Sequence, residues 1–524
     1  MSLTKLNDGF GKKFLSNICY IFILALLSYL IFNTGLHGDD YTSINAIQKG
    51  SFKDFLSFDS DKFQLFGIVN YYSIWFAYYV FGLENQIFYD AIKLFVHGFS
   101  IYFIFQFFKD YLPRDRALLS SVIFVLFPLH DTTTYWYMTL YYIFIPGTLL
   151  YSHYLIRNNR YLAGVVMSTL GAMAHYASPP YVFGLAVIFL IENKFKKAVI
   201  FAIPGFLYVA YYFWIKFNLI GIERRINLDL SILDFFKQAI LQVLSFLESA
   251  IGPSYWLKVF YAIESISITS LIIVIVISVF AFLKYKNISK APPLSKSLLV
   301  GFISVLILSF GMYALTGLYS HSALNLGNRS TVYGSLLIAF LLSVFLPSNK
   351  KSVAFLLIIF LTPTFGLSDH WKYWNSHQKT IIENIKNNKD LKDIEYSSTL
   401  VVTGNIYSKL GPFAHIEFFS MPWNVNAIFQ DSVKAKNIVA LTPYVVVEAD
   451  YIIDPKFNGK YSLKNKLYIY DSEKDLVKSI SAKEVPNLIE QQPRIVRHWM
   501  QIFKDTWIQN TIVWLSPRLI YLFE

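Results

Sequence analysis

Long apolar runs recur along the first 370 residues of this chain and limit what it can fold into. Stretches such as "ICYIFILALLSYLIF" and "SITSLIIVIVISVFAFL" approach or reach the roughly 17 to 25 residues that a helix needs to cross a bilayer. Only 15% of the residues are charged, against about 25% in an ordinary soluble domain. The sequence therefore predicts an α-helical, multi-span membrane protein.

Basic residues gather in five clusters between the apolar runs, "KDYLPRDR" (109–116), "RNNR" (157–160), "NKFKK" (193–197), "KYKNISK" (284–290) and "PSNKK" (347–351). The net charge of +12 is thus spread over short loops, which argues against a nucleic-acid partner. The positive-inside rule places all five clusters in the cytoplasm with the N-terminus. We predict about eleven spans and an extracytoplasmic C-terminus, with spans near 14–33, 84–108, 117–130, 138–156, 161–176, 180–193, 198–218, 266–283, 298–318, 330–346 and 352–368.

The first outer loop, 34–83, is expected to be ordered and pressed onto the bilayer. Its segment "IVNYYSIWFAYYVF" (68–81) is apolar, but a crossing there would move the next basic cluster outside, and its Tyr and Trp suit the headgroup region. We interpret it as a re-entrant or interfacial helix. Tyr41, Ile44 and Ile47 recur at helical spacing and predict a short amphipathic helix on the membrane surface.

Two further regions lie on the predicted outer side. The stretch 219–265 contains "FFKQAILQVLSFLESAIGP", which we interpret as an interfacial helix or a marginal span. From about residue 370 we expect an exposed helix, "WKYWNSHQKTIIENIKNN", then strands and a hairpin that turns at Asn458 and Gly459. The predicted domains are a transmembrane domain, 1–369, and a small α+β domain, 370–524, with a membrane-associated tail.

Ionisable residues are costly at membrane depth and therefore mark candidate functional sites. Here they gather at the outer ends of the predicted spans, although each has a second interpretation. Asp40 is placed to cap a helix that starts at Tyr41, Arg329 to reach the headgroups, and histidines at span ends are common interface residues. Asp90 and Lys93 share one face of the second span and fit a buried ion pair as well as a ligand site. The candidates are His37, Asp39, Asp40, Tyr41, His130, Asp131, His175, Arg224, Arg225, His321 and Arg329.

Two short motifs stand out among these residues, "HGDDY" after the first span and "FPLHDTTTYW" after the third. The first resembles the acidic motif in the first outer loop of the GT-C glycosyltransferases, which use lipid-linked sugar donors. The second is similar to a Pro, His, acid and Trp run in the tetratricopeptide-bearing O-mannosyltransferases of that superfamily. Here the acid directly follows the histidine, no tetratricopeptide repeats follow, and "AHYASPP" stands where a "KE" pair is often found. The resemblance covers roughly residues 14–368 and leaves the acceptor open.

The resemblance implies a GT-C-like fold of the protein O-mannosyltransferase or aminoarabinose transferase type and a reaction at the outer surface. A carboxylate there takes the proton of the acceptor hydroxyl, a role for Asp39 or Asp40, and Asp131 orients the acceptor or completes a metal site. Arg329, with Arg224 and Arg225 as second choices, stabilises the leaving phosphate. The expected pocket residues are His37, Tyr41, His130, His175 and His321.

The implied activity is transfer of a hexose or pentose from a polyprenyl-phosphate donor, with inversion, to a glycan, wall polymer or protein. Such a reaction belongs to the assembly or modification of cell-surface glycans. A transporter or flippase of lipid-linked sugars stays open, although paired halves and midplane charges are scarce. A polymerase or ligase with a diphosphate-linked donor also stays open. No cofactor is certain, and the outer acids also suit a hard divalent metal ion.

Overall fold

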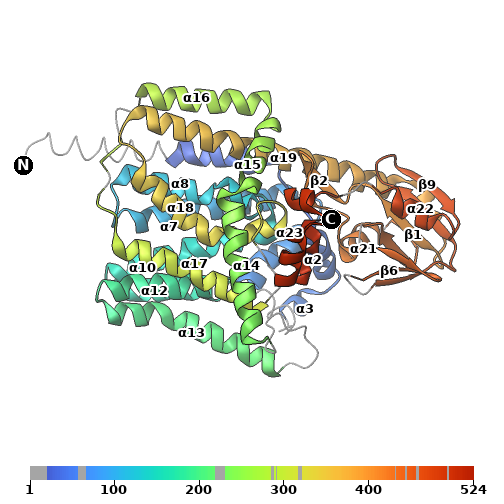
Figure 1. Cartoon of the computed structure of the whole chain (residues 1–524), viewed down its shortest axis with the longest axis horizontal. Helices are drawn as coiled ribbons and strands as arrows, with labels where there is room; N and C mark the ends of the chain where they lie inside the picture. Colours follow the sequence, from blue (N-terminus) through green and yellow to red (C-terminus); the bar gives the residue numbers. More distant parts are fainter. Residues whose placement is uncertain are drawn as a thin grey trace, which may run out of the picture.

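The computed structural model describes residues 20–56, 67–218, 230–284, 288–290, 292–316, 321–430, 432–442, 445–455, 459–492 and 495–523. These residues form a bundle of helices with a smaller domain of strands and helices at one end (Figure 1). Within them, six helices are long and apolar enough to cross a membrane, or up to seven if a bent pair, Ile232–Glu264 and Ile268–Leu283, is one span. The helical, membrane-type architecture with a C-terminal strand domain is confirmed, while the count of about eleven spans stays a prediction.

The helices of the bundle run side by side (Figure 1). Gly184 and Gly301 lie where two of them, α12 and α17, approach closely, because a Cβ on Gly184 would lie 2.6 Å from the backbone nitrogen of Val305. After a first helix, Tyr20–Ile31, the bundle contains α7 (Gln86–Phe108), α8 (Arg114–Val125), α10 (Tyr141–Arg157), α11 (Tyr161–Ala172), α12 (Pro179–Ile191), α13 (Phe195–Asn218), α16 (Ile268–Lys284), α17 (Lys296–Thr316), α18 (Val332–Phe345) and α19 (Lys350–Asn387).

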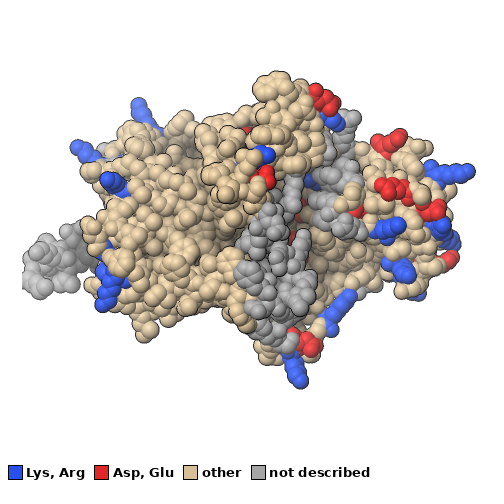
Figure 2. Space-filling model, turned by 60° about the horizontal axis from the view of Figure 1, so that its bottom comes forward, with Lys and Arg blue, Asp and Glu red and all other residues tan. Residues whose placement is uncertain are grey.

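The basic clusters between the predicted spans lie together at one end of the bundle. In Figure 2 the left end carries Lys and Arg but no Asp or Glu, and a broad band without charged side chains follows it. Hydrogen bonds and ion pairs connect the five clusters: Arg157 Nε to Asp110 at 3.8 Å, Lys197 Nζ to Arg157 O at 2.7 Å, Arg116 Nε to Ser289 O at 2.6 Å and Arg116 Nη2 to Ser348 Oγ at 3.0 Å.

Two helices, α14 (Ile232–Ile251) and α15 (Pro253–Glu264), run across the bundle where it meets the C-terminal domain (Figure 1). One side of α14 is apolar and exposed, including Leu233, Phe236 and Leu244. A helix with this orientation and this exposed face suits the interface plane of a membrane. The interfacial interpretation of the stretch 219–265 therefore fits the part of it that the structure describes.

The helix α2 (Asp39–Gln48) differs from the prediction in two respects. It begins at Asp39 rather than at Tyr41. Its N-cap residue is Gly38, and no side chain forms a capping hydrogen bond to the first turn among the described residues. Its apolar residues Tyr41, Ile44 and Ile47 are buried inside the protein and do not face lipid. They are buried because α2 packs between α6 (Phe76–Phe81) and α21 (Pro422–Phe429). The expectations of a capping Asp40 and of a helix on the membrane surface were therefore wrong.

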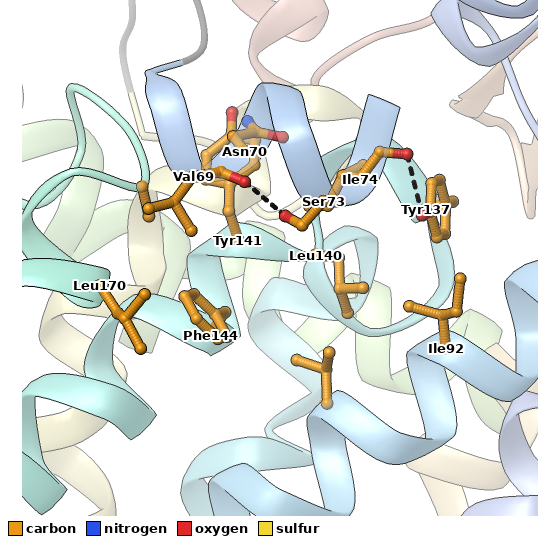
Figure 3. Close-up of a pocket in the computed structure, with 12 residues that line it drawn as sticks. Val69, Asn70, Ser73, Ile74, Ile92, Tyr137, Leu140, Tyr141, Phe144 and Leu170 are labelled. Atoms are coloured by element: carbon orange, nitrogen blue, oxygen red, sulfur yellow. Dashed lines mark hydrogen bonds between the residues drawn. The ribbon is translucent and has the colours of Figure 1, made fainter. Parts of the chain in front are cut away.

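The predicted re-entrant or interfacial helix is one helical segment built from α5 (Ile68–Asn70), a π-turn η1 (Tyr71–Trp75) and α6 (Phe76–Phe81). It lies across the ends of α7, α10 and α11, as seen at the top of Figure 3. The short helix α3 (Phe52–Leu56) packs its Phe55 ring on that of Tyr71, with centroids 5.0 Å apart. This segment covers one end of the bundle and does not run between the spans.

The last helix of the bundle, α19, continues without a break into the C-terminal domain (Figure 1). Its second half was expected to be exposed, but one face is buried, including Trp371, Trp374, Gln378 and Ile381. This face is buried because both the loop around His37 and the C-terminal domain pack against it: Gln378 bonds His37, and the Trp374 ring lies 6.4 Å from that of Phe418. The predicted boundary at 369/370 therefore falls inside a single helix.

The C-terminal domain has a four-stranded sheet in the order β4-β1-β8-β9, in which β1 (Thr399–Thr403) is parallel to both β4 (Asn437–Ala440) and β8 (Leu467–Asp471). β9 (Leu476–Ile480) is antiparallel to β8. The predicted hairpin is present as β6–β7, but Gly459, expected in the turn, is the first residue of β7 and pairs with Asp454, while Asn458 lies outside the described residues. The remaining elements are β2 (Tyr407–Leu410), β3 (Phe413–Glu417), β5 (Val446–Glu448), β6 (Tyr451–Asp454), β7 (Gly459–Ser462), α20 (Lys389–Lys392), α22 (Val485–Glu490) and α23 (Trp507–Leu515).

Candidate active site

The two sequence motifs contact each other at the end of the bundle that faces the C-terminal domain. Gly38 of "HGDDY" has a φ of 47°, and a Cβ at this position would lie 2.6 Å from the ring of Trp136 in "FPLHDTTTYW". Both the backbone conformation and the close contact therefore require glycine here. As a result α2, which carries the acidic pair, starts directly against the second motif.

A buried ion pair fixes the loop in front of α2. Lys93 Nζ lies 2.8 Å from Asp90, and Asp90 accepts hydrogen bonds from the backbone nitrogens of Asn33, at 2.8 Å, and Gly35, at 3.0 Å. Lys93 in turn donates to the carbonyl oxygens of Gly35 and Tyr135. The ion-pair interpretation of Asp90 and Lys93 is thus confirmed, and the pair holds the first motif beside the second.

Asp40 is fully buried at the start of α2. Its Oδ1 accepts a hydrogen bond from the hydroxyl of Tyr78 at 2.5 Å, and its Oδ2 accepts one from the backbone nitrogen of His37 at 2.8 Å. Burial raises the pKa of Asp40 to about 7, and the two hydrogen bonds oppose this shift because they favour the carboxylate. The group is thus held in place and shielded from solvent.

Asp39, by contrast, is only partly buried. Its Oδ1 accepts a hydrogen bond from Trp423 Nε1 of α21 at 2.7 Å, and Trp423 is itself 40% exposed. The carboxylate of Asp39 therefore lies at the junction between the bundle and the C-terminal domain, where a second molecule has access. The structure thus gives the two adjacent acids different surroundings.

His37 and Tyr41 hold the first motif together. His37 Nε2 is 2.6 Å from the carbonyl oxygen of Thr34 and donates to it, so Nδ1 accepts from the side-chain amide of Gln378 at 2.8 Å. Burial lowers the pKa of His37 to about 3, which keeps the ring neutral. The Tyr41 hydroxyl donates to the carbonyl oxygen of Leu36. Both side chains therefore tie the motif to the loop in front of it, and His37 also bonds α19.

Asp131, at the start of α9 (Asp131–Tyr135), accepts four hydrogen bonds from four different elements. A carboxylate has about four lone-pair sites, so its capacity is filled, and the side chain is buried. The donors to Oδ1 are Lys258 Nζ of α15 at 2.6 Å and Asn328 Nδ2 at 2.5 Å, and those to Oδ2 are Trp371 Nε1 of α19 at 2.6 Å and His415 Nε2 of β3 at 2.8 Å.

None of the four donors is among the residues predicted from the sequence, and three of them, Lys258, Trp371 and His415, come from elements far from Asp131 in the chain. They lie 127, 240 and 284 residues from Asp131 in the chain, and no spacing rule connects them. Together they join the bundle to the C-terminal domain at one carboxylate. The Trp371 ring also lies 4.7 Å from the His37 ring, so this cluster contacts the first motif as well.

Arg329 and His175 come together around Tyr141. Arg329 belongs to η4 (Leu326–Thr331) and interacts electrostatically with the Tyr141 hydroxyl, and the His175 ring stacks on Tyr141 with centroids 3.8 Å apart. His130 instead bonds Thr133, and His321 bonds Gln242 of α14. Arg224 and Arg225 lie outside the described residues.

An apolar cavity of about 310 Å³ lies below the α5–η1–α6 segment (Figure 3). Within the described part of the chain, neither atom of the buried Asn70 side-chain amide, which lines the cavity, has a hydrogen-bond partner. A space of this kind suits an elongated apolar ligand with a polar end. Other lining residues are Ile74, Ile92, Tyr137, Leu140, Tyr141 and Phe144.

Two tyrosines of the cavity wall connect it to candidate residues of the sequence. On one side, the ring of Tyr137 is 5.3 Å from that of Tyr78, which bonds Asp40. On the other side, Tyr141 contacts His175 and interacts with Arg329. Figure 3 shows Tyr137 and Tyr141 at separate places along the wall. Chains of contacts thus lead from the cavity wall to Asp40 through Tyr78 and to His175 through Tyr141.

A metal site is not assigned. Among the residues that the structure describes, no three His, Cys, Asp or Glu side chains come together as metal ligands. Asp131 uses its oxygens on protein donors, and Asp39 and Asp40 are adjacent but differently exposed. The divalent ion considered from the sequence stays a prediction.

Comparisons with known proteins add no further constraint. No protein-family model matches the chain, and no curated protein matches it. The likeness to GT-C glycosyltransferases therefore depends on the two motifs, which the fold brings into contact.

Proposed function

We propose that this protein is an integral-membrane glycosyltransferase that moves a sugar from a polyprenyl-phosphate donor to an acceptor hydroxyl at the extracytoplasmic face. The observation that carries the proposal is the apolar cavity, whose wall residue Tyr137 packs on the Tyr78 that bonds Asp40 and whose wall residue Tyr141 is within the electrostatic influence of Arg329. A lipid-linked sugar has the same sequence of parts: an apolar chain, an anionic phosphate and a reacting sugar carbon.

The proposed topology has eleven spans with the N-terminus in the cytoplasm of a bacterium. Its support is the gathering of all five basic clusters at the end of the bundle opposite the C-terminal domain. Under the positive-inside rule that end is cytoplasmic. The acidic pair, the α5–η1–α6 segment and the C-terminal domain then lie outside, where lipid-linked sugars are used.

The donor would place the proximal part of its chain in the cavity beneath the α5–η1–α6 segment. Its phosphate would lie toward Tyr141 and Arg329, because a guanidinium pairs with phosphate oxygens through two parallel N–H bonds. Arg329 then stabilises the negative charge that develops on the phosphate as the bond to the sugar breaks. His175, stacked on Tyr141, would line this end of the site.

Asp39 is our choice for the base because it is the more accessible of the two acids. Its carboxylate takes the acceptor proton while the acceptor oxygen attacks the anomeric carbon. The bond from that carbon to the phosphate oxygen breaks, and polyprenyl phosphate leaves with both electrons. Attack opposite the leaving group inverts the anomeric centre. Asp40, buried behind it, positions the first turn of α2 through Tyr78 and the backbone of His37.

The test uses the full chain in liposomes with polyprenyl-phosphate hexose and pentose donors, and it measures release of polyprenyl phosphate. We expect release to be lost in Asp39→Asn and kept in Asp390→Asn, an exposed acid of α20 that serves as the matched control. Full activity in both Asp39→Asn and Asp40→Asn would contradict the proposal. Movement of an intact labelled donor across the bilayer without cleavage would instead identify a transporter.

A further inference from the structure

A second cavity, of about 340 Å³, lies between α19 and the C-terminal domain. It is separate in composition from the apolar cavity, because aromatic and charged side chains line it together. From α19 come Tyr373 and Trp374, and from the C-terminal domain come Asn405, Tyr407, Lys409 and Glu473. The site proposed above uses none of these residues.

The rim of this cavity is formed at the carboxyl ends of two neighbouring parallel strands. Gly404 and Asn405 directly follow β1, while Ser472 and Glu473 directly follow β8, which pairs with β1 in parallel. β1 also pairs with β4 on its other side. In open sheets with parallel strands, ligands bind outside the carboxyl ends where neighbouring connections diverge.

The rim is held in one conformation by its own backbone and side chains. Gly404 and Asn405 have φ angles of 79° and 50°, and a Cβ on Gly404 would lie 2.9 Å from Glu473 Cγ. The side-chain amide of Asn405 donates to Ser472 Oγ at 3.1 Å and accepts from His377 Nε2 at 2.9 Å. The loop after β1 is therefore organised before any ligand arrives, which lowers the entropy cost of binding.

Three groups of this cavity are available to a ligand. Tyr373 is 69% exposed. In the described part of the chain, neither the ammonium of Lys409 nor the carboxylate of Glu473 has an ion-pair or side-chain hydrogen-bond partner. An exposed aromatic ring beside a free donor and a free acceptor matches a ligand that has an apolar face and a polar edge.

We propose that this cavity is a saccharide-binding site. A pyranose ring presents C–H groups on its face, which pack on an aromatic ring, and hydroxyls at its edge, which bond to charged side chains. Tyr373 would take the face, and Lys409 and Glu473 the hydroxyls. A nucleotide fits less well, because β1 leads into the β2–β3 hairpin and not into a helix whose N-terminus would bind phosphate.

The test is binding of microbial oligosaccharides on a glycan array by the full-length protein in nanodiscs, followed by calorimetry with the strongest binder. We expect Tyr373→Ala to weaken binding by at least about tenfold and Glu473→Gln to weaken it as well. Tyr396→Ala is the matched control, because Tyr396 is 70% exposed on the same domain but does not line the cavity. Absence of glycan binding by the native protein, or equal binding by Tyr373→Ala, would overturn the proposal.

The saccharide site and the transferase proposal fail separately. Asp39→Asn should leave glycan binding unchanged, since Asp39 contacts α21 and is not part of this cavity. Loss of glycan binding in Asp39→Asn, with the protein folded, would contradict a separate site.

Discussion

The hydroxyl of Tyr78 donates a hydrogen bond to Oδ1 of Asp40 across 2.5 Å, and both side chains are buried. Tyr78 belongs to the helical segment that covers the apolar cavity, and Asp40 belongs to the helix that carries Asp39. This hydrogen bond therefore connects the α5–η1–α6 segment, which covers the cavity, to the helix that carries the acidic pair. The pKa of Asp40, and the effect of the Tyr78 hydroxyl on that pKa, can both be tested.

Asp40 makes thermal stability depend on pH. Burial raises its pKa from 3.8 to about 7, so the folded protein favours the protonated acid. That contribution is complete below the unfolded pKa and is lost as the pH rises through about 7. We expect native protein to lose unfolding temperature relative to Asp40→Asn between about pH 4 and about pH 7, with no further loss at higher pH, as measured by scanning calorimetry. Parallel curves for the two proteins would contradict a buried, titrating Asp40.

Tyr78→Phe should shift this transition upward. The hydroxyl of Tyr78 bonds the ionised form of Asp40 and so lowers its pKa, and its removal leaves the same burial with less stabilisation of the charge. The pH at which the loss of stability relative to Asp40→Asn levels off should therefore be higher in the Tyr78→Phe background. An unchanged or lower transition would show that the hydroxyl does not act on this carboxylate.

Asp131 should act as a positioning residue that keeps the C-terminal domain against the bundle. Asp131→Asn leaves the ammonium of Lys258 buried without its counter-charge, and breaking a buried pair in this way costs about 3–5 kcal/mol. Addition of Lys258→Met removes that charge. We expect the double variant to regain part of the stability, as measured by thermal unfolding, and part of the proposed transferase activity. A double variant that is stable but inactive would instead assign Asp131 to the chemistry.

The apolar cavity is testable by filling it. Ala174, two residues after the end of α11, lines the cavity, and if the cavity holds the lipid chain of the proposed donor, Ala174→Phe should raise the KM for that donor. Val166→Phe is the control, since Val166 of α11 is 51% exposed and does not line the cavity. Equal KM values for the two variants would remove the cavity from the binding site.

Local patterns predicted much of the architecture. Apolar runs predicted the helical, membrane-type architecture, charge clusters predicted the end of the bundle at which loops gather, and the spacing of Asp90 and Lys93 predicted their ion pair. The surroundings of α2 were predicted wrongly, because an apolar helical face that includes Tyr41 has the same residue spacing whether it contacts lipid or the C-terminal domain. Only the tertiary fold shows which surface covers it.

The candidate site was predictable in part. The motifs pointed to Asp39, Asp40 and Asp131, but their different surroundings arise from contacts far apart in the chain. Trp423 reaches Asp39 from 384 residues away, and His415 reaches Asp131 from 284 residues away. No helical or strand period connects such pairs, so accessibility and hydrogen-bond partners had to come from the structure.

The central claim, that the acidic pair performs sugar transfer with Asp39 as the base, is tested most directly by the mass of cell-surface glycans, because neither the sugar nor the acceptor needs to be known in advance. Cells that lack this gene should lose one sugar mass from a surface glycan, and the native gene and Asp390→Asn should restore it. Asp39→Asn, at equal protein level, should leave that mass absent. Full restoration by Asp39→Asn would contradict the account.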